Sequence, residues 1–129
     1  MNVLFILSDQ HNAANTGCYG HPLAVTPNLD RLARQGARFD HAYSSCPICV
    51  PARAAMFTGR HVFENGCWDN TAAWDGRLRG WSHHLTENGV ELVTVGKLDF
   101  NRGHLSPSCA PISPPCWGII KAKWRCGMR

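Results

Sequence analysis

Apolar residues occur along this chain in short runs that are separated by glycine, proline and polar residues. Residues 2–8 read Asn-Val-Leu-Phe-Ile-Leu-Ser, a continuous apolar run of strand formers, so we expect a central strand buried on both faces. Residues 90–95 have the same character, and residues 37–43 alternate apolar and polar side chains. The pattern therefore predicts two strands of a buried sheet and one half-buried strand.

Three segments between these strands have helical spacing and recognisable ends. Residues 26–36 start with Thr-Pro and finish at a glycine, and residues 81–88 are followed by a glycine. The third helix, residues 51–58, starts at Pro51 and stops before Gly59, while residues 60–80 show no period and read as irregular. Strands and helices that follow one another in this way predict the α/β class.

The net charge and the cysteines exclude several function classes. The chain has 129 residues and a net charge of +4, but residues 1–104 hold nine basic and nine acidic side chains, so the whole excess lies in residues 105–129. Residues 1–104 therefore carry no excess of basic side chains that would indicate a nucleic-acid-binding surface. Seven cysteines, an odd number without regular spacing, argue against a complete disulfide framework.

No apolar run approaches the roughly 18 residues that a membrane helix needs. The first residues also lack the basic region and separate apolar stretch of a signal peptide. We therefore expect no membrane partner and a cytoplasmic location for the chain as written. A periplasmic or secreted location is expected if a segment precedes Met1.

The segment around Cys49 combines a reactive side chain with the start of a helix. Cys49 stands just ahead of the helix expected from Pro51, where backbone N–H groups are unpaired and the macrodipole favours anions. Arg53, one turn further on, adds a permanent positive charge with forked donors. These residues predict an anion-binding site at the helix start, with the Cys49 side chain beside it as a nucleophile.

Charged residues also follow both buried strands. Asp9 comes directly after the first strand, where open α/β sheets bind ligands, and its carboxylate is a hard oxygen donor suited to Ca²⁺ or Mg²⁺. Lys97 follows the second strand and Gly96, which allows the backbone to turn closely. Both side chains are candidates for the same site.

The spacing Cys49-Val50-Pro51-Ala52-Arg53, followed by Ala-Ala-Met-Phe-Thr-Gly, resembles the signature of the sulfatase family within the alkaline phosphatase superfamily. Thr26-Pro27-Asn28 and Gly96-Lys97 also resemble that family. The run Gly96-Lys97-Leu98-Asp99-Phe100 with Gly103-His104 looks closer to the arylsulfatase K type, a glucuronate-2-sulfatase. Many members carry a histidine where this chain has Asp99.

This resemblance implies a fold, a chemistry and a set of site residues. The fold would be the N-terminal fragment of an alkaline-phosphatase-like sandwich with a largely parallel central sheet. Cys49 would be oxidised by the formylglycine-generating enzyme to formylglycine, whose hydrate attacks an aryl or carbohydrate sulfate ester. The implied catalytic residues are Cys49, Arg53 and Lys97, the substrate-binding residues Lys97 and His104, and the metal ligands Asp9, Gln10 and Cys49, with Ca²⁺ expected before Mg²⁺.

The last part of the chain does not fit this resemblance. We expect residues 1–104 to be the N-terminal part of a sulfatase catalytic domain. Residues 105–129 hold four of the eight prolines and no acidic residue, and we expect them to be disordered or the product of a frameshift. The remaining metal ligands of the family would lie beyond this chain, so we expect the isolated chain to be inactive.

Three other functions stay open at this point. Cys46-Pro47-Ile48-Cys49 is a Cys-x-x-Cys sequence, which is typical of thiol redox modules. The same two cysteines could form half of a zinc site, although no second pair has matching spacing. A phosphate or phosphonate monoester hydrolase is the third alternative, because its substrate is a similar tetrahedral anion.

Overall fold

The computed structural model describes residues 2–100 and the backbone of residues 117–124. It divides into two compact units. The first joins Met1–Asp9 to Ser44–Arg129, and the second is Gln10–Tyr43. Each unit is described by itself below. No helix in the described part of the chain has the length and apolarity to cross a bilayer.

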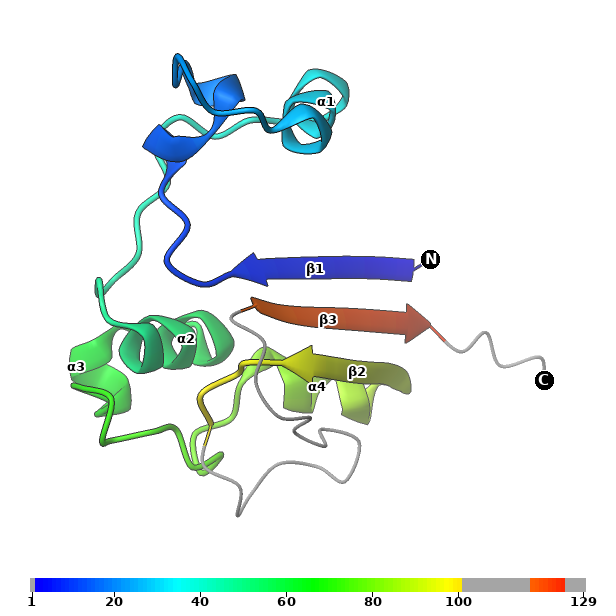
Figure 1. Cartoon of the computed structure of the whole chain (residues 1–129). Helices are drawn as coiled ribbons and strands as arrows, with labels where there is room; N and C mark the ends of the chain where they lie inside the picture. Colours follow the sequence, from blue (N-terminus) through cyan, green and yellow to red (C-terminus); the bar gives the residue numbers. More distant parts are fainter. Residues whose placement is uncertain (1, 101–116, 125–129) are drawn as a thin grey trace. The chain divides into compact units, whose positions relative to one another are not determined.

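A three-stranded sheet organises the first unit, with strand order β1-β3-β2. The strands are β1 (Asn2–Ser8), β2 (Val90–Gly96) and β3 (Trp117–Trp124). Figure 1 shows β3 between the other two, and both hydrogen-bonded pairs are antiparallel. Because β1 and β2 are each antiparallel to β3, they run in the same direction, and their carboxyl ends lie at the same edge of the sheet.

The expectation of a largely parallel sheet is wrong for these three strands. Residues 117–124 lie in the tail for which we expected no regular structure, yet they form the middle strand and separate β1 from β2. Single-sequence patterns give the direction of a strand only relative to its own chain, so an inserted antiparallel partner was not predictable from β1 and β2. The other residues of the predicted 105–129 tail lie outside the described residues.

The strand β1 is also less buried than its sequence predicts. The side chains of Leu4 and Ile6 are each 61% exposed, and Val3 and Phe5 on the opposite face are 49% and 39% exposed. A continuous apolar run shows that a strand can be covered on both faces, but the covering layers must come from other elements. None of the described elements covers β1 to that extent.

Helices of the first unit pack an aromatic core against β2. The helices are α2 (Cys49–Thr58), α3 (Val62–Asn65) and α4 (Trp81–Glu87). Phe57 of α2 is 1% exposed and its ring contacts those of Trp74, Trp81 and Phe100. The helix α2 ends as predicted, at Gly59 in the left-handed conformation with φ 67°, but it starts at Cys49, two residues earlier than expected.

The second unit consists of short helical segments and loops. Its elements are η1 (Ala13–Asn15), η2 (Gly17–Tyr19) and α1 (Pro27–Gln35). The strand predicted at residues 37–43 is absent from this unit. The backbone there has no ladder partner, and the Phe39 carbonyl instead accepts a hydrogen bond from the Tyr19 hydroxyl. Alternation of side chains alone therefore did not suffice to make a strand.

Candidate active site

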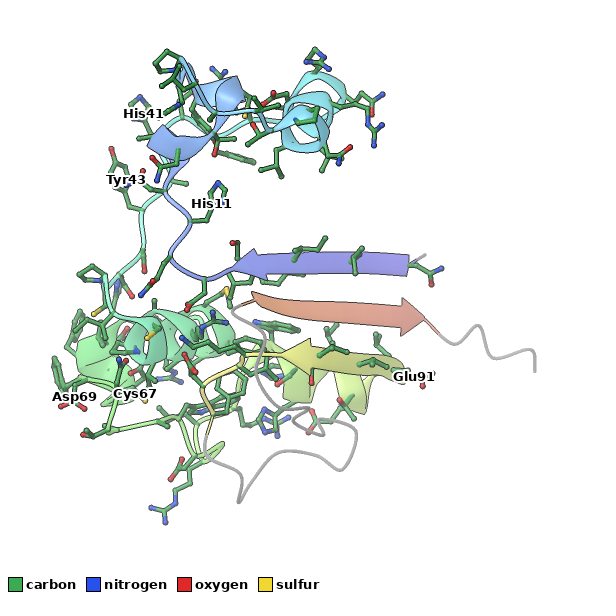
Figure 2. The ribbon with its side chains drawn as sticks, viewed as in Figure 1. His11, His41, Tyr43, Cys67, Asp69 and Glu91 are labelled. Carbon is green, nitrogen blue, oxygen red and sulfur yellow. The ribbon has the colours of Figure 1, made fainter. Side chains whose placement is uncertain are left out.

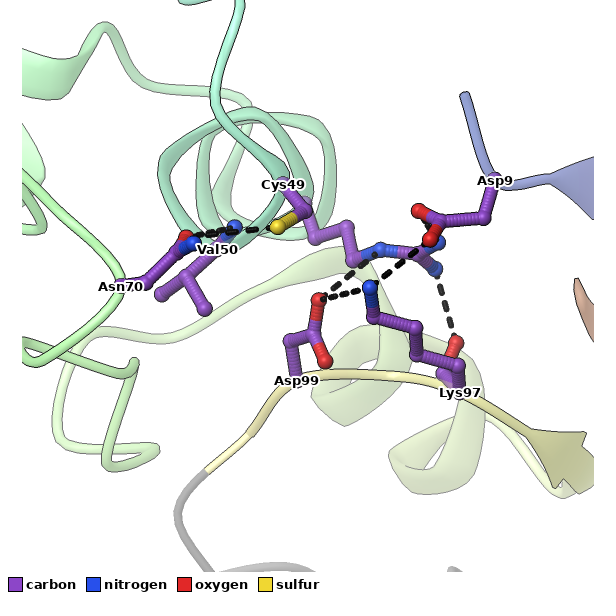
Figure 3. A network of polar contacts seen from close by, with 7 residues as sticks. Asp9, Cys49, Val50, Asn70, Lys97 and Asp99 are labelled. Atoms are coloured by element: carbon purple, nitrogen blue, oxygen red, sulfur yellow. Dashed lines mark hydrogen bonds and ion pairs between the residues drawn. The ribbon is translucent and has the colours of Figure 1, made fainter. Parts of the chain in front are cut away.

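The candidate site lies where the two outer strands end and α2 begins. Asp9 follows β1, and Lys97 follows β2 after Gly96, which has φ 93°. Helix α2 contributes Cys49 in its first turn and Arg53 one turn later. Figure 3 shows these side chains converging from the three elements. All of them belong to the first unit, so the site is formed within one compact body.

Arg53 joins the three elements through its guanidinium group. The residue is only 4% exposed. Its Nη1 donates to the Lys97 carbonyl at 2.7 Å, its Nη2 to Asp9 Oδ1 at 3.2 Å, and its Nε lies 3.4 Å from Asp99 Oδ2. Because a guanidinium is planar and forked, these contacts fix the side chain in one orientation. Arg53 therefore sets the relative positions of the helix and the two strand ends.

Lys97 lies between two carboxylates. Its Nζ donates to Asp9 Oδ2 at 2.8 Å and lies 3.6 Å from Asp99 Oδ2. The hydrogen bond that Lys97 donates to Asp9, aided by the charge of Asp99, raises the pKa of Lys97. The same bond from Lys97, together with Arg53, lowers the pKa of Asp9 although burial opposes this. Both groups are therefore ionised at neutral pH.

Asp99 completes a cluster of two cations and two carboxylates. Its backbone has φ 58°, which is uncommon for a residue with a side chain, and its Oδ2 is buried without a hydrogen bond in the described part of the chain. The ion pairs with Arg53 and Lys97 are its electrostatic partners. The sequence drew attention to Asp99 only as a departure from the family pattern, but the structure makes it part of the site.

Cys49 has a neighbour that the sequence did not predict. The Cys49 thiol donates to Asn70 Oδ1 at 3.3 Å, and the backbone N–H of Val50 donates to the same oxygen at 3.1 Å. Asn70 lies in the segment between α3 and α4, which has no period, so no pattern in the sequence indicated its place. Figure 3 shows the Cys49 sulfur between Asn70 and the Lys97 side chain.

The predicted site residues have different outcomes. Hydrogen bonds connect Asp9, Arg53 and Lys97, and Cys49 lies near them on α2. Gln10 belongs to the second unit and stays a predicted ligand. His104 lies outside the described residues and also stays a prediction.

The donor chemistry of the site fits a hard divalent cation in part. The Asp9 carboxylate uses one lone pair on each oxygen for Lys97 and Arg53, so further lone pairs remain for a metal ion. Within residues 2–100 and 117–124, no group of three or more His, Cys, Asp or Glu side chains is arranged to hold a metal. Asp9 therefore has oxygen lone pairs free for a cation, while ligation by the side chain at position 49 stays a prediction.

Comparisons with known proteins identify the family to which the chain is similar. Residues 1–100 match the family model described as Sulfatase. The chain is 35% identical over 96 residues to N-acetylglucosamine-6-O-sulfatase of Bacteroides thetaiotaomicron, which covers 74% of this chain and 17% of the relative. It is 31% identical over 107 residues to arylsulfatase K of Danio rerio, covering 83% of this chain and 20% of the relative.

A solved structure gives the same result for the fold. A protein in complex with its substrate D-glucosamine-2-N,6-O-disulfate superposes with a TM-score of 0.68 and 30% sequence identity, over 77% of this chain and 20% of that chain. This chain spans about a fifth of the length of the curated relatives it matches. The match of the family model over residues 1–100, which contain the whole described site, shows that the chain belongs to the sulfatase family.

Proposed function

We propose that this chain supplies the nucleophile and the anion-binding charges of an enzyme that hydrolyses sulfate monoesters. The observation that carries the proposal is the convergence of Cys49 at the start of α2 with Asp9, Arg53 and Lys97 at the two strand ends. We infer a sulfated carbohydrate as the substrate class, because the relatives include an N-acetylglucosamine-6-O-sulfatase and a protein solved with a glucosamine disulfate.

Lys97 is the group of this site that is best placed to bind a sulfate oxygen. An ammonium has three donors, of which one is used at 2.8 Å by Asp9, while the contact with Asp99 is longer, at 3.6 Å. The side chain is 25% exposed, so it is accessible from solvent. Its positive charge faces the oxygens of the ester and favours the negative charge that develops during cleavage.

Arg53 has a different role from the one its charge suggests. Three of its donor positions are already used by the Lys97 carbonyl, Asp9 and Asp99, and the residue is almost fully buried. Arg53 therefore holds Lys97 and Asp9 in position, and its long-range positive charge supports an anion without direct contact. We propose that it is a positioning residue.

Two groups that this structure does not contain would supply the remaining chemistry. Formylglycine made from Cys49 provides an oxygen nucleophile, and a divalent cation, Ca²⁺ before Mg²⁺, polarises the sulfate. The side chain at position 49 and Asp9 would hold the cation, with Gln10 as a further predicted ligand. The role of this chain is to keep that side chain at the helix start, beside Lys97 and Arg53.

Mass analysis of the peptide that contains residue 49 tests the proposal. The chain is produced together with the formylglycine-generating enzyme, and a Cys49→Ala variant serves as the control. We expect the aldehyde or its hydrate at position 49 of the parent chain only. A reversible Cys46–Cys49 disulfide in place of the aldehyde would contradict the proposal and favour the thiol redox module.

A binding measurement tests the role of Lys97 separately. Sulfate is titrated into the isotope-labelled chain, and the NMR signals of the backbone amides at Gly96 and Leu98 are followed. We expect saturable shifts of these signals in the parent chain that are absent in Lys97→Ala. A response that is the same for sulfate and for phosphate would instead support the phosphate monoester hydrolase, and shifts that persist in Lys97→Ala would show that the anion binds elsewhere.

A further inference from the structure

The segment between α3 and α4 provides the start of α2 with a cap that the helix itself lacks. The residue before α2 is Ile48, whose apolar side chain cannot accept a hydrogen bond, and no side chain of the flanking residues caps the helix. Asn70, 20 residues after Val50, takes this place with Oδ1 at 3.1 Å from the Val50 nitrogen. The first turn of α2 therefore depends on a residue from another part of the chain.

The contact with Cys49 does not follow from capping alone. A cap needs only the bond to a backbone N–H, yet Asn70 Oδ1 also accepts a hydrogen bond from the Cys49 thiol at 3.3 Å. Figure 3 shows the sulfur between Asn70 on one side and Lys97 on the other. The two lone pairs of this oxygen are thus divided between the helix backbone and the side chain at position 49.

The segment holds Asn70 in place through its neighbours. Figure 2 shows Cys67 and Asp69 on the segment that follows α3. Asp69 Oδ1 accepts hydrogen bonds from the Thr71 backbone at 2.8 Å and the Thr71 hydroxyl at 2.6 Å, and these bonds lower the pKa of Asp69. Cys67 and Trp74, on either side, are 5% and 2% exposed. Asn70 is therefore presented by a tight turn that is anchored at both ends.

We propose that Asn70 is a positioning residue that fixes the orientation of the side chain at position 49. The consequence for catalysis rests on the proposed function. The hydrate of formylglycine would carry two chemically similar hydroxyls on one carbon, and an acceptor on one side would favour one of them as its donor. Asn70 would hold that hydroxyl at the helix start and leave the other free.

The proposal is tested on the unconverted thiol, so its outcome does not depend on whether the chain hydrolyses sulfate esters. Asn70 restrains the Cys49 thiol by accepting a hydrogen bond from it. In Asn70→Ala this restraint is lost and the sulfur is free to turn toward a reagent. We expect Cys49 to be alkylated by iodoacetamide about threefold faster.

The variant Asn70→Asp gives the opposite expectation. It retains an oxygen that can accept from both the Val50 N–H and the Cys49 thiol, and a carboxylate is the stronger acceptor, so Cys49 should be held more firmly and react more slowly than in the parent chain. Rates are measured by mass spectrometry of each cysteine peptide, relative to Cys18 of the second unit. Asn88→Ala, at an exposed helix end, is the matched control. It should leave the alkylation rate of Cys49 relative to that of Cys18 unchanged.

A structural role alone would have a different result. If Asn70 only capped the helix, its replacement would lower the thermal midpoint of unfolding. The alkylation rate of Cys49 relative to that of Cys18 would then keep its parent value in both Asn70 variants. That result would overturn the proposal. If Asn70→Ala unfolds, the buried Cys67 becomes reactive in parallel. The test then rests on Asn70→Asp, in which an unchanged or faster reaction of Cys49 would overturn the proposal.

Discussion

Arg53 is one side chain that fixes the relative positions of several segments of the site. Its contacts reach the carbonyl of Lys97 and the carboxylates of Asp9 and Asp99, which come from segments 44 residues or more away in sequence. Two carboxylates in a mostly buried cluster repel one another unless both cations are present. The guanidinium is therefore required for the other charges to stay ionised together.

Replacing Arg53 by alanine should cost about 3 kcal/mol in the free energy of unfolding, because two carboxylates would keep only Lys97 as a partner. Arg53→Lys should recover only part of this, since a single ammonium cannot reproduce the forked contacts. Urea denaturation measures the free energy of unfolding of both variants. Arg77→Ala, which removes an exposed pair with Asp75, is the control and should change stability by less than about 1 kcal/mol. Equal effects of Arg53→Ala and Arg77→Ala would contradict the central position of Arg53.

The coupling of Asp9 and Lys97 predicts how stability depends on pH. The pKa of Asp9 in the folded chain lies below its ordinary value of 3.8, so its contribution is present above that value and is lost as the pH falls through the folded pKa. The pKa of Lys97 lies above 10.5, so its contribution is present below that value and is lost as the pH rises through the folded pKa.

We therefore expect the parent chain to be more stable than Asp9→Asn across neutral pH, and the difference to disappear in acid. Urea denaturation of both proteins at a series of pH values measures this difference. Asp75→Asn, at an exposed position, is the control and should show a small difference that varies little with pH. A constant gap between the parent and Asp9→Asn down to the most acidic pH would show that the ionised carboxylate does not stabilise the fold.

At the scale of elements, the start of α4 is determined by a close approach to α2. A Cβ atom at Gly80 would lie 2.4 Å from the carbonyl oxygen of Phe57, which is a backbone atom and cannot rotate away. Gly80 thus allows the N-terminal end of α4 to pack against the last turn of α2. The Trp81 indole, which donates to the Met56 carbonyl at 3.2 Å, fixes the same contact.

Gly80→Ala should destabilise the fold by about 2 kcal/mol, as overpacking of a rigid contact does. Gly59→Ala provides a comparison at the end of α2, because its φ of 67° is unfavourable for alanine but the space for a Cβ is free. That change should cost about 1 kcal/mol. Thermal unfolding followed by circular dichroism ranks the two, and a larger effect at Gly59 would contradict the packing argument.

The elements with local signals were predictable from the sequence, and those that depend on distant partners were not. Gly59 ends α2 and Pro51 lies in its first turn, although the helix starts two residues earlier at Cys49, because proline and glycine act on their own backbone. Gly96 and Lys97 were placed correctly because they follow a strong strand pattern. Asn70 was missed because its role comes from the path of an irregular segment, and the exposure of β1 was missed because burial depends on the layers around a strand.

At the scale of the whole molecule, β1 presents an apolar surface on both faces. The side chains of Leu4 and Ile6 lie on one face, and both are 61% exposed. Exposed apolar strands at a sheet edge are prone to pair with other copies of the same chain. We therefore expect concentration-dependent self-association of the isolated protein.

Ile6→Lys should shift this association to higher protein concentration, because a charge on the exposed face opposes packing with a second copy. Leu23→Lys, at an 83% exposed position of the second unit, is the control and should have little effect. Sedimentation velocity over a range of concentrations measures both. If Leu23→Lys dissociates the protein and Ile6→Lys does not, the contact lies away from β1.

The position of β3 has a consequence for how the molecule is made. All ladder hydrogen bonds of the described sheet pass through residues 117–124, so β1 and β2 have no ladder with one another. During synthesis, β1 is made long before this shared partner, whereas β2 comes only shortly ahead of it. The apolar strand β1 is therefore the one that stays unpaired for longest, and it is the strand that we expect chaperones to bind while the sheet is incomplete.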